Sequence, residues 1–395
     1  MKKKKVVGVV ASFLVAASVM AGCSSSSSTS GNASSSDSKT IKIGANLELS
    51  GGVASYGQSI KEGVDLAISE INKKGIDGKK LQLVSVDNKS DAAEATNGAI
   101  KLITQDKVSA VIGAATSTDT LAQVQIANDN KVPILTPTGT NPTVTVKDGK
   151  LNDYVFRTCF IDPFQGTVAA NFASNELKVK NAAVLIDSSS DYAKGLAASF
   201  KDFFKKNGGN VVSEEAYVAK DTDFHATLTR IKAKNPDFVF IPGYYEEVGL
   251  IVKQAREIGL NVPMMGADGW DSPKLVEIAG AKALNNTYIT NHYSSGDSDA
   301  KVQEFVKAFE AKYGGKTPDA FNALGYDSAY FIADAIKRAG SGDPQKIQKA
   351  LAETNNLSLV TGSMKLDKNH DPIKSAVILE YKDGKQTFKS KVNPQ

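Results

Sequence analysis

The chain has 395 residues, enough for about two domains and a large core. Its composition, 41% hydrophobic and 23% charged, excludes a wholly disordered chain, a collagen-like fibre and a disulfide-stapled miniprotein. The net charge is +4, and Lys2–Lys5 account for that surplus, so the rest of the chain does not favour a nucleic-acid-binding protein.

The first residues predict export. Lys2–Lys5 precede an apolar run, Val6–Met20, and two small residues then lead to Cys23. This order is typical of a secretory signal peptide, and the run is shorter than the ~20 residues of a transmembrane helix. Small residues directly before a cysteine match the bacterial lipobox, although Met20 replaces the usual leucine. We therefore expect lipidation of Cys23 and anchoring at the outer face of the cell membrane; plain secretion is the alternative.

A serine-rich stretch follows the cysteine. Ser24–Lys39 contains no residue suited to a core and predicts a flexible tether. The only other cysteine, Cys159, lies in the apolar run Tyr154–Phe160. We therefore expect no internal disulfide and a buried, unreactive Cys159.

From residue 40, short β-branched runs alternate with amphipathic stretches. We expect strands at 41–47, 81–86, 108–113 and 132–135, and helices at 58–73, 92–106 and 118–130. Strands separated by helices in this order predict βαβ units and a parallel sheet.

The same alternation then restarts. We expect strands at 182–186, 211–217, 238–241 and 264–265, and helices at 193–207, 224–234 and 248–258. Strands at 154–160 and 286–292 should pass between the two lobes, and helices at 300–313 and 318–338 should return to the first. Residues 364–366 and 376–381 are expected to form a hairpin-like pair that closes the second lobe.

The predicted fold class is α/β, with two doubly wound lobes joined by a hinge of several segments. The expected divisions are a signal peptide at 1–22, a lipid-anchored linker at 23–39, lobe 1 at 40–158 and 289–363, and lobe 2 at 159–288 and 364–395. Several crossings between two lobes suit closure on a small ligand.

The sequence contains none of the common catalytic motifs. There is no G-x-S-x-G, H-E-x-x-H or P-loop pattern, and no G-x-G-x-x-G after the first strand. The three histidines are His225, His292 and His370, and we expect His225 and His370 to be solvated. No clustered ligands predict a zinc site. We therefore expect no metal, no cofactor and no catalytic residues, although a scattered triad would escape this test.

Two loops of lobe 1 are rich in hydroxyl groups. Ligands of open α/β sheets bind beyond the carboxyl ends of strands. Gly113–Asp119 leads from a strand into a helix, where free N–H groups and hydroxyls suit a carboxylate. Helix capping by Thr116 or Ser117 is the alternative. Thr136–Pro142 follows the next strand, and together the two loops favour a shared ligand.

Lobe 2 offers the opposite polarity. Gly243–Glu247 and Gly266–Trp270 follow predicted strands and contain carboxylates. A carboxylate such as Asp268 can face an ammonium group, and Tyr244 and Trp270 can form apolar or cation–π walls. Solvated loop charges are the alternative. An anion-binding site in lobe 1 opposite an acidic side chain in lobe 2 predicts a zwitterionic ligand, and hence an amino acid.

Several stretches carry a resemblance to a known family. They are Leu49–Gly57, Gly113–Ser117, Pro137–Pro142, Asp191–Gly195, Asp223-Phe224 with Pro236-Asp237, Gly243–Glu247 and Met265–Gly269. In this order, across residues 41–381, the chain resembles the leucine/isoleucine/valine-binding family of ABC-transporter substrate-binding proteins. The resemblance implies the type I periplasmic-binding fold, in which two Rossmann-like lobes close on a ligand.

The resemblance also implies a ligand site. Its members would be Tyr56, Ala115, Thr116, Ser117, Thr138, Gly139, Thr140, Tyr192, Tyr244, Asp268, Trp270 and Phe321. Ser117, with backbone groups of both hydroxyl-rich loops, would take the α-carboxylate. Thr140 and Asp268 would hold the α-ammonium. Many relatives carry Glu at the position of Asp268, and Trp270 could narrow the side-chain pocket.

The implied function is capture of a branched-chain amino acid for an ABC importer. We expect a monomeric binding protein, not an enzyme, that passes its ligand to a membrane permease and its ATPase. A receptor module that reports an amino acid or related amide to a membrane sensor is the alternative, and an exported enzyme is a third possibility.

Overall fold

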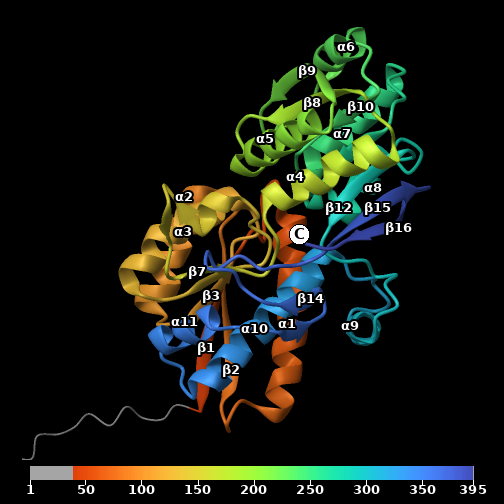
Figure 1. Ribbon diagram of the computed structural model, residues 1–395. Coiled ribbons are helices and arrows are strands. Elements are labelled where there is room, and N and C mark those ends of the chain that lie inside the picture. Colours follow the sequence, from red (N-terminus) through yellow and green to blue (C-terminus); the bar gives the residue numbers. More distant parts are fainter. Residues whose placement is uncertain (1–38, 395) are drawn as a thin grey trace, which may run out of the picture. The chain divides into compact units, whose positions relative to one another are not determined.

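Two β-sheets organise the chain (Figure 1). The computed structural model describes residues 39–394. The predicted signal peptide, Cys23 and nearly all of the serine-rich tether lie outside that range. Within it, no helix combines the length and apolar composition needed to cross a bilayer.

The first sheet is entirely parallel. Its strands are β1 (Thr40–Leu47), β2 (Lys80–Asp87), β3 (Ala110–Gly113), β4 (Ile134–Thr136) and β7 (Val155–Arg157), in the order β2-β1-β3-β4-β7. The helices between them are α1 (Ala54–Lys74), α2 (Ala92–Ile100) and α3 (Ser117–Asn130), and a π-turn at Lys101–Gln105 extends α2. Strands β3 and β4 are buried along their whole length, as expected for central strands of a sheet covered on both faces.

The second sheet repeats this arrangement and adds two strands. It comprises β8 (Asn181–Asp187), β9 (Asn210–Tyr217), β10 (Phe238–Phe240), β11 (Met264–Gly266), β12 (Thr287–Asn291), β15 (Ala376–Lys382) and β16 (Lys385–Val392), in the order β16-β15-β12-β11-β10-β8-β9. Strands β8 to β12 are parallel, and β15 and β16 are antiparallel. Its helices are α4 (Asp162–Asn171), α5 (Asp191–Lys206), α6 (His225–Ala233), α7 (Tyr245–Glu257) and α8 (Pro273–Ala279).

Both sheets therefore place their first five strands in the order second, first, third, fourth, fifth. In such a sheet the switch point lies beside the first strand, between β1 and β3 in one sheet and between β8 and β10 in the other. Ligands of doubly wound folds bind at this point. The predicted α/β class with two doubly wound units is confirmed.

The chain returns to the first sheet after β12. Helices α9 (Ala300–Lys312), α10 (Ala320–Ala339) and α11 (Pro344–Ala352) follow, and α10 lies along α1 (Figure 1). The two helices approach closely at Gly63 and Gly325. A Cβ atom at Gly63 would meet the Asn322 carbonyl oxygen, and one at Gly325 would meet that of Ile60. The predicted return of these helices is confirmed.

The predicted hairpin of 364–366 with 376–381 is wrong. Met364 ends β14 (Gly362–Met364), which pairs with β13 (Leu357–Leu359), whereas β15 pairs with β16. The turn between β15 and β16 is Asp383-Gly384, and both residues have positive φ. That pair suits a two-residue hairpin turn, so the turn makes β16 the hairpin partner of β15.

Three side-chain predictions had different outcomes. Cys159 is buried and free, as predicted, and burial raises the pKa of its thiol to about 12. His225 is exposed, as predicted. The prediction for His370 is wrong: its ring is buried, stacks on Phe156 at 4.2 Å and bonds the Val155 carbonyl oxygen through Nδ1.

Candidate ligand-binding site

A small pocket lies between the two sheets, beyond the carboxyl ends of their strands. Its lining residues are Tyr56, Ala115, Ser117, Thr138, Tyr192, Tyr244, Asp268, Gly269 and Phe321. The cavity between these residues has a volume of about 10 Å³, room for about one water molecule. A larger ligand would fit only if these walls moved apart.

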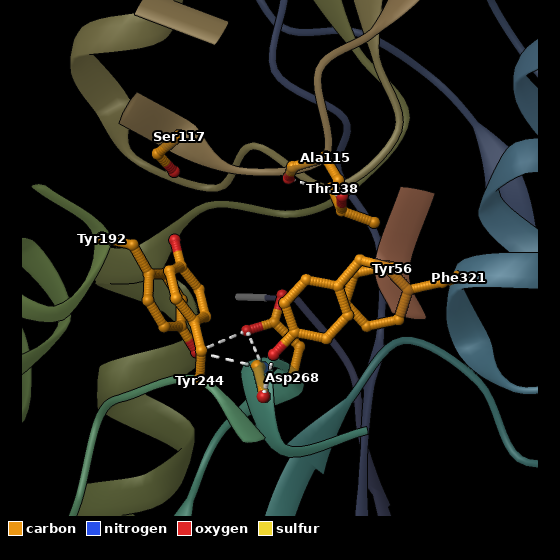
Figure 2. Close-up of a pocket in the computed structure, with 9 residues that line it drawn as sticks. Tyr56, Ala115, Ser117, Thr138, Tyr192, Tyr244, Asp268 and Phe321 are labelled. Atoms are coloured by element: carbon orange, nitrogen blue, oxygen red, sulfur yellow. Dashed lines mark hydrogen bonds between the residues drawn. The ribbon is translucent and has the colours of Figure 1, made fainter. Parts of the chain in front are cut away.

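Segments after four strands and the first turns of four helices, α1, α3, α5 and α10, bring these residues together. Ala115 and Ser117 follow β3, and Thr138 follows β4. From the second sheet, Tyr244 follows β10 and Asp268 follows β11. Figure 2 shows Ala115, Ser117 and Thr138 along one side of the pocket, with Tyr192, Tyr244 and Asp268 opposite them. The structure thus brings together eight of the residues that the sequence analysis assigned to the site.

A side chain of the protein itself occupies part of the predicted anion-binding site in the loop after β3. The carboxylate of Glu48, buried just beyond β1, accepts hydrogen bonds from Ala115 N–H at 2.9 Å and Thr116 N–H at 3.0 Å. The prediction that these N–H groups are free is therefore wrong. Burial raises the pKa of Glu48, and the neighbouring Asp119 raises it further.

Ser117 remains the group best placed to receive a carboxylate. It is the first residue of α3, where the helix dipole favours negative charge. Its Oγ accepts from Asn141 N–H at 3.2 Å, which leaves the hydroxyl proton available to donate. The Thr138 hydroxyl, by contrast, donates to the Ala115 carbonyl oxygen at 2.7 Å.

A buried arginine holds the loop after β4. Arg157, fully buried on β7, donates to the carbonyl oxygens of Gly139 at 2.5 Å and Asn141 at 3.0 Å. Its Nε lies 2.8 Å from Asp371 Oδ1, which balances the charge. In the same loop the Thr140 hydroxyl is buried and interacts with the carboxyl group of Asp162.

Asp268 is the acid on the facing side. Its Oδ1 accepts from Tyr192 OH at 2.8 Å, Gln165 Nε2 at 3.0 Å and Gly269 N–H at 3.1 Å. Its Oδ2 lies 3.0 Å from His292 Nε2. The side chain is only 5% exposed, so its position is fixed by these donors and by the short turn Asp268–Trp270.

Four aromatic rings make the apolar walls. Tyr56 and Phe321 are stacked with centroids 4.2 Å apart and planes at 5°, and Tyr192 and Tyr244 are stacked at 5.2 Å and 8° (Figure 2). Burial raises the pKa of Tyr56, Tyr192 and Tyr244 well above the usual range, so all three remain neutral phenols. The walls therefore offer ring surface and hydroxyl groups but no charge.

The structure places the other four predicted residues outside the pocket. Trp270 is fully buried in the core of the second sheet, where its Nε1 donates to the Ile241 carbonyl oxygen at 2.9 Å. Its ring covers Gly266, so the prediction that it narrows the pocket is wrong. Thr116 caps α3 through Asp119 N–H at 3.1 Å. Gly139 and Thr140 lie in the loop that Arg157 holds.

Direct bonds join the two sides around the pocket. The Tyr56 hydroxyl donates to the Gly269 carbonyl oxygen, and the Tyr245 hydroxyl donates to that of Gly52 at 3.1 Å. Ser55 Oγ and Ser272 Oγ lie 2.8 Å apart. These contacts enclose the pocket, so the protein in this conformation would cover a bound ligand from both sides.

Three functional side chains escaped the sequence analysis. Glu48 and His292 each follow directly after a strand, β1 and β12, so the rule that located the other loops would also have found them. Gln165 lies within α4, and no local pattern marks it. It reaches Asp268 because α4 packs beside β12, which is a tertiary contact.

Comparisons with known proteins agree with this geometry. The sequence profile of a family described as "Periplasmic binding protein" matches residues 40–386. The chain is similar to the leucine-, isoleucine-, valine-, threonine-, and alanine-binding protein of Pseudomonas aeruginosa, with 33% identity over 84% of this chain and 87% of that protein.

Solved structures show the same likeness. The branched-chain amino acid transporter substrate binding protein LivJ from Streptococcus pneumoniae, in complex with isoleucine, has a TM-score of 0.85 and 41% identity, covering 90% of this chain and 100% of that one. A solute binding protein of an ABC transporter from R. palustris, in complex with benzoate, has a TM-score of 0.81 and 26% identity, covering 90% and 97%.

Proposed function

The chain belongs to the leucine/isoleucine/valine-binding family of periplasmic binding proteins, and from that premise we propose that it captures an aliphatic α-amino acid and delivers it to an ABC permease. The observation that carries this proposal is the position of Asp268 across the pocket from Ser117. An acid on one side and a helix N-terminus on the other match the two charged groups of an amino acid.

The charges of the pocket favour a zwitterion over an anion. Among the described lining residues, Asp268 is the only one with an ionisable carboxyl group, and no lysine or arginine lines the pocket to neutralise a second negative charge. A ligand with a carboxylate and no amine would gain the Ser117 contact but would face Asp268 unpaired, which costs affinity. The R. palustris relative is in complex with benzoate, an acid without an amine, so the unpaired charge of Asp268 is what would distinguish amino acids from such acids in this chain.

The walls favour an aliphatic side chain. The rings of Tyr56, Phe321, Tyr192 and Tyr244 supply apolar surface. The Pseudomonas aeruginosa relative is named for leucine, isoleucine, valine, threonine and alanine, and the Streptococcus pneumoniae relative holds isoleucine. Leucine, isoleucine and valine are therefore the first candidates.

Capture involves closure and no chemistry. We assign the carboxylate to Ser117 and the ammonium to Asp268. The moving parts are lobe 1, residues 40–158 and 289–363, and lobe 2, residues 159–288 and 364–395. A ligand drives closure only by binding the closed form more tightly, and contacts from both sides of the pocket provide that difference.

Delivery to a permease is favoured when the protein stays near the membrane. The lipobox-like sequence before Cys23 and the tether up to Lys39 support lipid anchoring at the outer face of the membrane. Mass spectrometry of the mature chain should find a lipid on Cys23, and Ser24→Ala, the matched control, should keep that modification. An unmodified Cys23 in the membrane-associated protein would exclude this anchor.

The first experiment is a ligand screen by thermal unfolding. Residues 40–395 are unfolded and refolded to remove carried-over ligand, and then heated with each amino acid and with a panel of amides, sugars and aromatic acids. A ligand that binds only the folded state raises the melting temperature by mass action. We expect the largest rise with leucine, isoleucine or valine, and recovery of the ligand unchanged.

Other outcomes have defined meanings. A rise confined to other amino acids would keep the zwitterion site and reassign the side-chain specificity. A response only to benzoate-like acids, or to no amino acid, would overturn the proposed function. Conversion of the ligand during incubation would show an enzyme.

A further inference from the structure

A buried histidine lies directly behind the proposed ammonium site. His292 follows β12, and its side chain is 1% exposed. Its Nε2 lies 3.0 Å from Asp268 Oδ2, and its ring stacks on Phe160 with centroids 3.6 Å apart. The other ring nitrogen, Nδ1, is buried and has no hydrogen-bond partner within the described residues.

The two oxygens of Asp268 have different surroundings. Oδ1 already accepts three hydrogen bonds, from Gln165, Tyr192 and Gly269 N–H. Over residues 39–394, the only side chain or backbone group that bonds Oδ2 is His292. Oδ2 is therefore the oxygen with capacity left for a ligand, and His292 is the group that orients it.

The hydrogen-bond pattern defines the state of the imidazole. The carboxylate can only accept, so Nε2 carries the proton. A second proton on Nδ1 would be a buried donor with no acceptor, which opposes the charged form. Burial lowers the pKa of His292, whereas Asp268 raises it; Lys374 and Asp271 face it with opposite effects, Lys374 lowering the pKa and Asp271 raising it.

We propose that His292 is a positioning residue for the amine subsite, which as a neutral imidazole holds Asp268 Oδ2 toward the ligand and as an imidazolium competes with the ligand for it. The inference rests on the proposed function, because it needs a ligand that carries an ammonium group. A bound ammonium and an imidazolium would share one carboxylate, so binding must release the proton from His292. By linkage, affinity then falls as the pH drops.

The test compares two substitutions that separate the two roles. His292→Gln keeps an N–H donor near the position of Nε2 but does not titrate. His292→Phe keeps a ring that can stack on Phe160 but removes the donor. His225→Gln, on an exposed histidine, is the matched control. Dissociation constants for L-leucine and L-isoleucine are measured by titration calorimetry on the full chain from about pH 5 to about pH 8.

The expected results differ between the variants. As the pH falls from about 8 to about 5, the affinity of wild type and of His225→Gln for the amino acid should drop at least about threefold. The affinity of His292→Gln should equal that of wild type at about pH 8 and should drop clearly less as the pH falls. His292→Phe should bind about tenfold more weakly at every pH, because Oδ2 loses a charge-assisted hydrogen bond. The unfolding temperature of each variant without ligand identifies any that fails to fold.

Two results would overturn the inference, and they are distinguishable. If the wild type binds amino acids but His292→Gln keeps the full loss at low pH, His292 does not titrate against the ligand and this inference alone fails. If the wild type binds no amino acid at any pH, the proposed function fails and the inference fails with it. A folded His292→Phe variant with wild-type affinity would also exclude a positioning role.

Discussion

At the scale of single residues, hydrogen bonds from the protein orient Asp268. Four donors hold its two oxygens: Gln165 of α4, Tyr192 of α5, the N–H group of Gly269 in the same turn, and His292 just after β12. Such a carboxylate needs little rearrangement to accept an ammonium, so most of the interaction remains available for binding. It follows that the charge of Asp268, and not only its size, should determine the affinity.

The first prediction concerns that charge. Asp268→Asn keeps the shape of the side chain but removes the negative charge, and we expect binding of an α-amino acid to weaken by about 2 kcal/mol or more. Titration calorimetry measures the change. Glu246→Gln, on a half-buried carboxyl outside the pocket, serves as the control. An Asp268→Asn variant with wild-type affinity would remove Asp268 from the amine subsite.

The second prediction concerns Trp270, which the structure places in the core. Trp270→Phe leaves the buried Ile241 carbonyl oxygen without its donor and opens a small cavity. We expect the free energy of unfolding to fall by about 1–3 kcal/mol, measured by urea denaturation. Because Trp270 does not line the pocket, the relative affinities for leucine, isoleucine and valine should stay the same. A changed order among these ligands would place Trp270 back in the site.

Sequence analysis located most of the pocket but misplaced its details. Ala115, Ser117, Tyr244 and Asp268 could be predicted because each follows a strand, and strand ends of a doubly wound sheet converge. Glu48 blocks two of the expected N–H donors, and only the folded structure shows that its side chain turns toward Ala115.

At the scale of elements, the contact between α1 and α10 supports one wall of the pocket. Tyr56 lies near the start of α1 and Phe321 near the start of α10, so their stacked rings depend on how the helices pack. The helices can approach closely because Gly63 and Gly325 leave room for the facing carbonyl oxygens.

The third prediction follows from this close approach. Gly325→Ala adds a methyl group against the Ile60 backbone and forces the helices apart. We expect a loss of about 1–3 kcal/mol in the free energy of unfolding, together with weaker ligand binding, because the Tyr56–Phe321 pair shifts. Lys337→Ala, on the exposed face of α10, should change stability by less than about 0.5 kcal/mol. Equal stabilities for the two variants would contradict this packing argument.

The hairpin β15–β16 shows why some elements were missed. Strand β16 alternates charged and polar residues with few apolar ones, as an edge strand does, so hydrophobic periodicity gave little signal. The turn residues Asp383 and Gly384 carried a clearer one. The turn residues therefore predict the pairing of β16 with β15 better than the apolar pattern does.

At the scale of the whole molecule, the repeated βαβ alternation was enough to predict two doubly wound units. Periodicity identified the parallel strands β1 to β4 and β8 to β12 because they form short apolar runs between amphipathic stretches. It could not predict how α4, α8 and α11 pack. These helices are short, and their positions depend on contacts made far along the sequence.

The fourth prediction concerns how the stability of the folded chain depends on pH. Burial, and then the charge of Asp268, raise the pKa of Asp162 from 3.8 to about 8. The unfolded chain releases this proton at much lower pH than the folded chain. The stability from this group is therefore present at low pH and is lost as the pH rises toward about 8.

Asp162→Asn removes this titration. Its free energy of unfolding should fall less than that of the wild type between about pH 5 and about pH 8, by an amount on the order of 1 kcal/mol or more. Urea denaturation across this range measures both. Asp148→Asn, on an exposed turn, should keep the wild-type profile. Parallel profiles for Asp162→Asn and wild type would show that Asp162 is already ionised at low pH.

The buried position of Trp270 has a further use. It is the only tryptophan in the chain, and it lies two residues from Asp268 in the same short turn. Light emitted on excitation of tryptophan therefore comes from one place in the protein, the short turn that also carries Asp268. The chain carries its own optical reporter, and the arrival of a ligand can be followed in real time without any attached dye.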